Sequence, residues 1–336
     1  MAVVEKAAVV GAGVIGSAWA ARFALHGVDV SVVDPNPETG RIIDEVFANA
    51  RAAWGELALP PVTEGAVTVV DSIAEAVAEA QHVQESAPEN LDVKRDILAE
   101  IDRQAPPEAV IASSTSGIKP TDLQGSLAHP ERLLVGHPFN PVYLLPLVEV
   151  CGGERTEGWA IAAAMDAYSS ISMKPLHVRV EIDAFIADRL LEAVWREALW
   201  LINDGVATTE EIDDAIRYGF GLRWAQMGLF ETYRAAGGEG GVEHFIRQFG
   251  PTLALPWSKL TDVPELSDEL VDMLVAQSDA QSGQYTTREL ERVRDRNLAG
   301  ILKALETNNW AAGRTLAEQR IRLTDNTRPP ACPSGN

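Results

Sequence analysis

Gly11-Ala12-Gly13-Val14-Ile15-Gly16 is the stretch that decides the fold of this chain. An apolar run at residues 7–10 precedes it, as expected of a buried parallel strand, and a proline-free segment of helical composition at residues 17–26 follows it. In such a strand–turn–helix the first glycine permits the tight turn, the second lets the main chain approach a pyrophosphate, and the third lets helix and strand pack closely. The helix N-terminus adds N–H donors and a favourable dipole. The pattern therefore predicts a dinucleotide-binding turn.

The second predicted strand, residues 28–33, ends at an acidic residue. Asp34 follows Gly16 by eighteen residues. A carboxylate at this place accepts hydrogen bonds from the adenosine ribose hydroxyls and repels a 2′-phosphate, so we expect NAD rather than NADP. A glycine turn without a ligand and an FAD-binding fold are the alternatives, and nothing further along the chain supports FAD.

The composition limits the classes of function. With 336 residues and 46% hydrophobic residues the chain can bury the cores of two domains, and we expect neither a signal peptide nor a membrane span. The formal net charge of −21 argues against a nucleic-acid partner and gives a polyanionic substrate little to bind. Cys151 and Cys332 are the two cysteines, so we expect a reducing cytoplasm and no disulfide framework. No metal site is expected.

Strand-like and helix-like segments alternate as far as about residue 180, the order that a doubly wound α/β sheet requires. From Asp183 onward the pattern is helical, with Thr208 and Glu211 at capping-box spacing. We therefore predict a Rossmann-type domain at residues 1–182, an all-helical domain at 183–324 and a disordered tail at 325–336. Further strands are expected at 66–70, 82–85, 109–112, 132–136, 146–150 and 175–180, and helices at 72–80, 90–104 and 156–171.

A histidine and a glutamate lie twelve residues apart in the first domain. The histidine opens the run His137-Pro138-Phe139-Asn140-Pro141, and Glu149 follows it by twelve residues, in an apolar run at 147–150. Alcohol oxidation sends a hydride to the nicotinamide and the hydroxyl proton to a base, and an imidazole titrates near the working pH. The pair therefore predicts a dehydrogenase. A histidine satisfied in a loop before proline is the alternative.

Four segments, in one order and spacing, carry a family resemblance. They are Glu85-Ser86-Ala87-Pro88-Glu89-Asn90-Leu91-Asp92-Val93-Lys94, residues 112–118, residues 137–149, and Ala184-Phe185-Ile186-Ala187-Asp188-Arg189. Together they resemble the 3-hydroxyacyl-CoA dehydrogenase superfamily over nearly the whole chain. The helical part is most similar to its carnitine 3-dehydrogenase branch, through residues 218–228 and 277–281.

The resemblance implies a role for several residues. His137 corresponds to the catalytic base, and Glu149 to the acid that orients its imidazole. Ser116 corresponds to a catalytic hydroxyl that contacts the substrate oxygen, and Asn140 to a polar residue of the same pocket; both are also ordinary turn formers. Glu89 and Lys94 correspond to positions that line the NAD site. The resemblance further implies that the helical domain binds substrate and that the enzyme is a homodimer.

Asp188 departs from the family pattern. Where acyl-CoA enzymes carry an amide, this chain has a carboxylate, which accepts hydrogen bonds but cannot donate them when ionised. Its charge favours a cation such as a quaternary ammonium group. We expect Asp188 to contact the substrate, and a structural ion pair with Arg189 or another base is the alternative.

The resemblance implies that the substrate is L-carnitine, oxidised at its 3-hydroxyl to 3-dehydrocarnitine. Coenzyme A fits less well, because acyl-CoA enzymes carry a longer lysine-rich insertion after Asp34, whereas residues 40–59 here contain two arginines and three acids. Other 3-hydroxy acids (L-gulonate or a 3-hydroxyacyl-CoA) and a non-catalytic NAD-binding structural protein stay open. Aromatic faces bind methylated cations. The candidates, for each of which core packing is the more common role, are Tyr143, Phe220, Trp224, Phe230 and Tyr233.

Overall fold

The fold was taken from a computed structural model, which describes residues 4–60, 63–236, 241–249, 255, 257–259, 267–270, 272–273, 276, 284 and 286–326. The motif at 277–281 and tail residues 327–336 lie outside the described residues. Contacts divide the chain into two units. The first comprises Met1–Ile186 with Arg292–Asn336, and the second comprises Ala187–Glu291.

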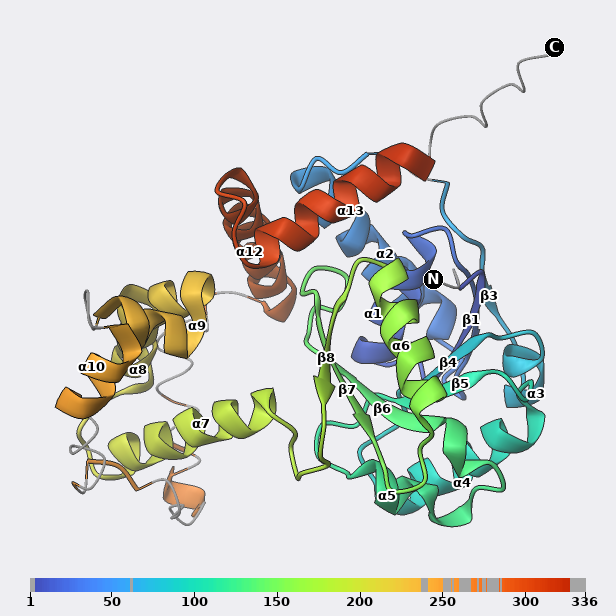
Figure 1. Cartoon of the computed structure of the whole chain (residues 1–336), viewed down its shortest axis with the longest axis horizontal. Helices are drawn as coiled ribbons and strands as arrows, with labels where there is room; N and C mark the ends of the chain where they lie inside the picture. Colours follow the sequence, from blue (N-terminus) through green and yellow to red (C-terminus); the bar gives the residue numbers. More distant parts are fainter. Residues whose placement is uncertain are drawn as a thin grey trace. The chain divides into compact units, whose positions relative to one another are not determined.

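The first unit is built on an eight-stranded sheet, and Figure 1 draws its strands as arrows. Every predicted strand is confirmed to within two residues. The strand order is β3-β2-β1-β4-β5-β6-β7-β8, so the chain reverses direction across the sheet between β1 and β4, where α/β proteins bind ligands at the carboxyl ends of the strands. The strands are β1 (Lys6–Val10), β2 (Asp29–Val33), β3 (Val67–Val69), β4 (His82–Glu85), β5 (Val110–Ser113), β6 (Leu133–Pro138), β7 (Leu147–Gly152) and β8 (Lys174–Val178).

Helices cover both faces of this sheet, which confirms the doubly wound α/β class. One core cluster contains side chains of α1 (Val14–Ala24), α2 (Thr39–Glu56) and α6 (Gly158–Ser170). A second cluster contains side chains of α3 (Ile73–Val77), α4 (Leu91–Gln104) and α5 (Pro120–Leu123). Residues 7–10 are buried on both faces, as their unbroken apolar character predicts. Two short 3₁₀ turns, η1 (Gln124–Ser126) and η2 (Pro130–Arg132), lead into β6.

One strand pair departs from the parallel pattern. β7 runs antiparallel to β6, whereas the other neighbouring strands are parallel. The connection at residues 139–146 is too short for a crossover, which takes a dozen residues or more, so the two strands form a hairpin. The register of this hairpin places His137 directly opposite Glu149.

The described part of the second unit is helical. Its helices are α7 (Ala187–Asn203), α8 (Thr209–Ala215), the π-helical turn η3 (Ile216–Phe220), α9 (Gly221–Ala236) and α10 (Gly241–Phe249). The predicted capping box is confirmed, since the Thr208 hydroxyl accepts the Glu211 N–H and the Glu211 carboxylate accepts the Thr208 N–H. No described helix is both long and apolar enough to cross a bilayer.

The last two helices belong to the sheet unit, where we expected a single helical domain to run to residue 324. α12 (Thr287–Thr307), from Arg292 onward, and α13 (Ala312–Asn326) are grouped with the first unit. Gln319 donates to His26 on α1's C-terminal turn, and Arg320 donates to the main chain at the end of α2. Helix α13 also includes the first two residues of the predicted tail. Amphipathic helices show a buried face in their sequence but do not show which surface covers it.

Candidate active site

The glycine turn joins β1 to α1 through main-chain contacts that leave no room for side chains. A Cβ atom at Gly16 would lie 1.8 Å from the Gly11 oxygen, and one at Gly11, where φ is +94°, would lie 2.7 Å from the Ser86 carbonyl. Gly13 faces open space, and no side chain caps the helix that begins after it. This open helix N-terminus fits the pyrophosphate of a dinucleotide.

Asp34 lies beside this turn at the end of β2. Its Oδ2 accepts a hydrogen bond from the Ala12 N–H at 2.6 Å, and its Oδ1 accepts one from the Asn36 N–H at 2.8 Å. The carboxylate is therefore held in place by the main chain, and each oxygen keeps a lone pair for a further donor. Its position fits the predicted ribose contact.

The Lys94 side chain is buried rather than exposed beside the glycine turn. Its side chain is 1% exposed, and its ammonium donates to both oxygens of the buried Glu85, at 2.9 and 3.2 Å, and to the Ala87 carbonyl. Glu85 also accepts the Ser113 hydroxyl at 2.5 Å. The ion pair therefore joins α4 to the end of β4, and the Ser113 hydroxyl joins the ends of β4 and β5. The sequence analysis did not assign Glu85, although a carboxylate that ends an apolar strand nine residues before a lysine was a usable signal.

Glu89 holds the loop that carries Ser116. Its Oε1 accepts hydrogen bonds from the Thr115 hydroxyl and from the main-chain N–H groups of Ser116 and Gly117. Its other oxygen lies 3.6 Å from the Lys94 ammonium. Two residues predicted for different roles, Glu89 and Ser116, are thus in direct contact.

His137 and Glu149 form a buried pair. The side chains are 5% and 0% exposed, and the imidazole Nδ1 lies 3.0 Å from the Glu149 Oε2. Because a carboxylate can only accept, the hydrogen between the two groups is assigned to Nδ1. In the neutral imidazole Nε2 is then the acceptor. This geometry suits a general base whose far nitrogen is fixed by an acid.

The segment before α7 completes the surroundings of this pair. The Ile186 N–H donates to the Glu149 Oε1 at 3.0 Å, so both carboxylate oxygens are held. The Phe185 ring is fully buried, with its centroid 5.8 Å from that of the imidazole, and the Phe139 ring lies at 5.1 Å on the same imidazole. Ala184 and Phe185 both adopt left-handed conformations, with φ of +60° and +48°. Such backbone is costly for residues other than glycine and is found where the surroundings enforce it.

The other predicted site residues lie in the loop that follows β6 and in the second unit. Asn140 is exposed in the loop that follows β6, three residues after His137. Asp188 lies in the first turn of α7, in the second unit. Tyr143, a candidate for cation binding, is buried and donates to Asp295, so its hydroxyl end has a structural partner. Within the described ranges, no three side chains gather as potential metal ligands.

Matches to known proteins cover both parts of the chain. Residues 6–182 match the NAD-binding domain of 3-hydroxyacyl-CoA dehydrogenase, and residues 185–286 match its C-terminal domain. The chain belongs to the 3-hydroxyacyl-CoA dehydrogenase family. This confirms the family and the NAD cofactor, and it makes the protein an NAD-dependent 3-hydroxy acid dehydrogenase by class.

Within the 3-hydroxyacyl-CoA dehydrogenase family, curated relatives with high identity are named for carnitine. An L-carnitine dehydrogenase/betainyl-CoA thioesterase of Agrobacterium fabrum is 61% identical over 95% of this chain, which spans 65% of that protein. An L-carnitine dehydrogenase of Pseudomonas aeruginosa is 52% identical over 94% of this chain and 98% of its own length. A solved structure, the NAD+-dependent dismutase 5-formyl-3-hydroxy-2-methylpyridine 4-carboxylic acid 5-dehydrogenase, is 28% identical with a TM-score of 0.79, over 90% of this chain and 99% of that one.

Proposed function

We propose that this enzyme oxidises the 3-hydroxyl group of L-carnitine to 3-dehydrocarnitine with NAD, and that His137 is the general base. The observation that carries the proposal is the buried pair of His137 and Glu149 at the carboxyl end of β6. The names of the relatives at 50–61% identity support the substrate.

The cofactor side of the site is formed by the main chain of the glycine turn. The N-terminus of α1 would hold the pyrophosphate, Asp34 would accept the ribose hydroxyls, and Glu89 and Lys94 would fix the loops beyond β4 and β5 against the cofactor. When bound, NAD supplies the acceptor for the hydride. A 2′-phosphate would meet the charge of Asp34, which favours NAD over NADP.

Proton removal is the task of the protein itself. In the proposed mechanism the His137 Nε2 accepts the proton of the substrate hydroxyl, because Glu149 holds the Nδ1 hydrogen on the opposite side of the ring. Once the proton arrives, the Glu149 carboxylate stabilises the imidazolium. Ser116 and Asn140 would hold the substrate oxygen. Phe139 and Phe185 exclude water from the imidazole by packing against it.

The charges on α2 and at the start of α7 favour a cationic substrate over coenzyme A. The two bases of α2, Arg41 and Arg51, are each paired with glutamates, so they have little to offer a phosphate. A quaternary ammonium group about 5 Å from Asp188 would gain roughly 3 kcal/mol at an effective dielectric of about 20. Phe220 and Trp224, with centroids 4.5 Å apart, are the candidate aromatic faces of the second unit.

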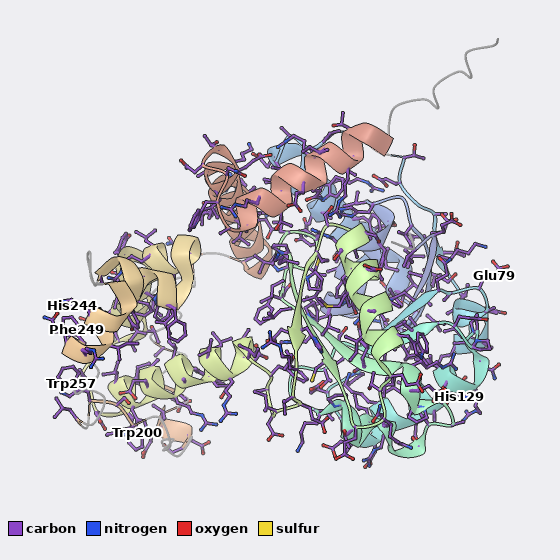
Figure 2. The ribbon with its side chains drawn as sticks, in the orientation of Figure 1. Glu79, His129, Trp200, His244, Phe249 and Trp257 are labelled. Atoms are coloured by element: carbon purple, nitrogen blue, oxygen red, sulfur yellow. The ribbon has the colours of Figure 1, made fainter. Side chains whose placement is uncertain are left out.

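The proposal includes a homodimer in the cytoplasm. Large apolar side chains of the second unit are exposed, and Figure 2 labels two of them, Phe249 and Trp257. Exposed apolar side chains that gather in one patch often form a protein–protein interface. A chain with two cysteines needs no oxidising compartment. Light scattering on the purified protein would show twice the mass of the chain if the dimer forms.

A panel of substrates tests the proposed function. Initial rates of NADH formation would be measured with L-carnitine, D-carnitine, L-gulonate, 3-hydroxybutyrate and its CoA thioester. We expect the highest kcat/KM for L-carnitine. A preference for gulonate or the thioester would contradict the substrate assignment, and no turnover on any of them would favour a non-catalytic NAD-binding protein.

Asp188→Asn tests the expected contact with the cation. The change removes the negative charge and keeps the shape, so we expect kcat/KM for L-carnitine to fall by about tenfold or more, equivalent to about 1.4 kcal/mol. The rate on 3-hydroxybutyrate, which carries no cation, should change by no more than about twofold. Equal losses on both substrates would instead assign Asp188 to a structural ion pair.

A further inference from the structure

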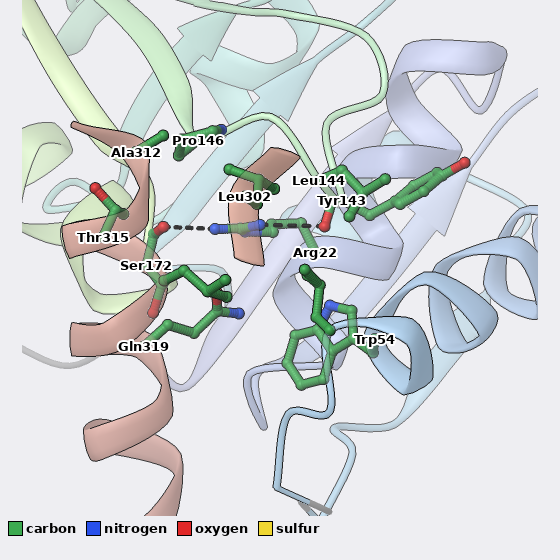
Figure 3. A pocket seen from close by; sticks show the side chains of 12 residues that line it. Arg22, Trp54, Tyr143, Leu144, Pro146, Ser172, Leu302, Ala312, Thr315 and Gln319 are labelled. Atoms are coloured by element: carbon green, nitrogen blue, oxygen red, sulfur yellow. Dashed lines mark hydrogen bonds between the residues drawn. The ribbon is translucent and has the colours of Figure 1, made fainter. Parts of the chain in front are cut away.

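Arg22, near the C-terminal end of α1, is a fully buried arginine that binds main-chain carbonyls (Figure 3). Its Nε donates to Ile171 at 2.9 Å and its Nη2 to Ser172 at 2.5 Å, and both carbonyls lie just beyond the C-terminus of α6. Burial lowers the pKa of Arg22 to about 9. A cation is favoured at a helix C-terminus by the carbonyl dipoles, which explains how the charge is tolerated there.

The third hydrogen bond of Arg22 goes to the loop that follows His137. Its Nη1 donates to the Tyr143 carbonyl at 3.2 Å, and Figure 3 shows this bond beside the one to Ser172. Tyr143 is in turn held through its side chain, because its hydroxyl donates to the Asp295 Oδ2 at 2.6 Å from α12. A single residue of the loop is thus held at its main chain by one helix and at its side chain by another.

The position of Tyr143 is transmitted to the residues beside the imidazole. The N–H groups of Leu144 and Leu145 both donate to the Pro141 carbonyl, at 3.0 and 2.9 Å, so residues 141–145 form one tight turn. Asn140 directly precedes this turn, and the Phe139 ring packs on His137. Moving Tyr143 would therefore move the substrate side of the loop.

We propose that Arg22 and Asp295 are positioning residues: through Tyr143 they set the loop 139–146 against His137. This rests on the proposed function, because it assigns the loop to the substrate side of a working site. Arg22 lies on the helix whose other end faces the dinucleotide. The contact of Arg22 with Tyr143 thus connects the loop on the substrate side to the same helix that would hold the cofactor.

The test is a double-mutant cycle between Tyr143 and Asp295. For Tyr143→Phe we expect kcat/KM for L-carnitine to fall by about tenfold, mainly through KM, with the Kd of NAD within about twofold of wild type. Asp295→Leu should cost as much, and the double variant no more than either, because both changes remove the same hydrogen bond between Tyr143 and Asp295. Asp295→Asn keeps an acceptor for the phenol and should stay within about threefold of wild type. Arg22→Lys, which loses the fork of donors, should lose activity in the same way.

Glu306→Gln is the matched control. Glu306 also joins α12 to its surroundings, because its carboxylate pairs with Arg320 of α13. Its kinetics should be those of wild type, and hydrogen exchange of the amides at 139–146 should rise in Tyr143→Phe and Arg22→Lys only. Unchanged kcat/KM in both of those variants, or an equal loss in Glu306→Gln, would overturn the proposal. A wild type that oxidises 3-hydroxybutyrate but not L-carnitine would contradict the proposed substrate alone, since the ratios between variants can be measured on either acid.

Discussion

Two buried histidines of the same sheet, His137 on β6 and His82 on β4, differ in what surrounds their rings. His137 is paired with the Glu149 carboxylate at 3.0 Å. His82 packs against the rings of Phe23 and Tyr168 and has the neutral Gln84 amide oxygen 3.3 Å from its Nε2. Burial lowers the pKa of His82 to about 4, so this ring is neutral at the working pH. Burial alone does not make a base, because a buried imidazole needs an acidic partner to hold a proton.

Removing His137 should have the largest effect. For His137→Ala we expect kcat to fall by about a hundredfold to ten-thousandfold, as for loss of a general base, with the affinity for NAD nearly unchanged. Steady-state rates and NAD titration by fluorescence measure the two quantities. His82→Leu is the matched control for loss of a buried imidazole, and its kcat should stay within about twofold of wild type. Normal turnover in His137→Ala would remove this residue from the mechanism.

Glu149→Gln tests whether the carboxylate partner alone accounts for the difference between His137 and His82. The amide keeps the shape and an oxygen for the His137 Nδ1 hydrogen, but it cannot stabilise the imidazolium by charge. We expect kcat to fall by about a hundredfold, in the range that loss of an orienting partner costs. The same rates should be unaffected by Glu154→Gln, a change at an acid just beyond β7. Wild-type turnover in Glu149→Gln would contradict the orienting role.

His82 should instead be visible in the pH dependence of stability. Its folded-state pKa of about 4 lies below the usual value of 6.5, so between these values the unfolded chain binds the extra proton. Stability is therefore lost as the pH falls through this window, by about 2 kcal/mol between pH 7 and pH 5. Chemical denaturation of His82→Leu at both pH values should show a loss smaller by that amount. An identical pH dependence in wild type and variant would refute the assignment.

The smallest effect is expected for substitutions at Ala184, in the segment that precedes α7. Ala184 has a φ of +60° and lies two residues before Ile186, whose N–H donates to Glu149. Ala184→Gly relieves this conformation, whereas Ala184→Val adds a β-branch that disfavours it. We expect the free energy of unfolding of Ala184→Val to lie about 1 kcal/mol below that of Ala184→Gly. Equal values would show that the segment is not strained.

Most of the sheet could be predicted because its signals are local. Apolar runs bounded by turns gave all eight strands, and the glycine spacing gave the first crossover. Helix α2 was given no assignment, although Ile43, Phe47, Ala50 and Trp54 are buried at helical spacing and could have shown it. The partners of α12 and α13 could not be predicted, because they are set by contacts such as Gln319 with His26, 293 residues apart.

For the candidate site, too, local signals were predictable from the sequence, whereas contacts between distant segments were not. His137 and Glu149 were found from residue type and spacing, whereas the antiparallel hairpin that places them opposite each other was not. Lys94 was assigned to the cofactor site by resemblance. Its burial against Glu85 depends on how α4 packs beside β4, which the spacing of residues in the sequence does not reveal. The roles of Ser116, Asn140 and Asp188 stay predictions.

The β6–β7 hairpin limits how the segment between its strands can be altered. Side chains alternate between the two faces of a sheet, so a slip of one residue in the pairing would turn Glu149 away from His137. Insertions or deletions at 139–146 are therefore far more hazardous here than in an ordinary surface loop. A designer who seeks a new substrate preference should exchange residues one for one in this stretch and leave its length alone.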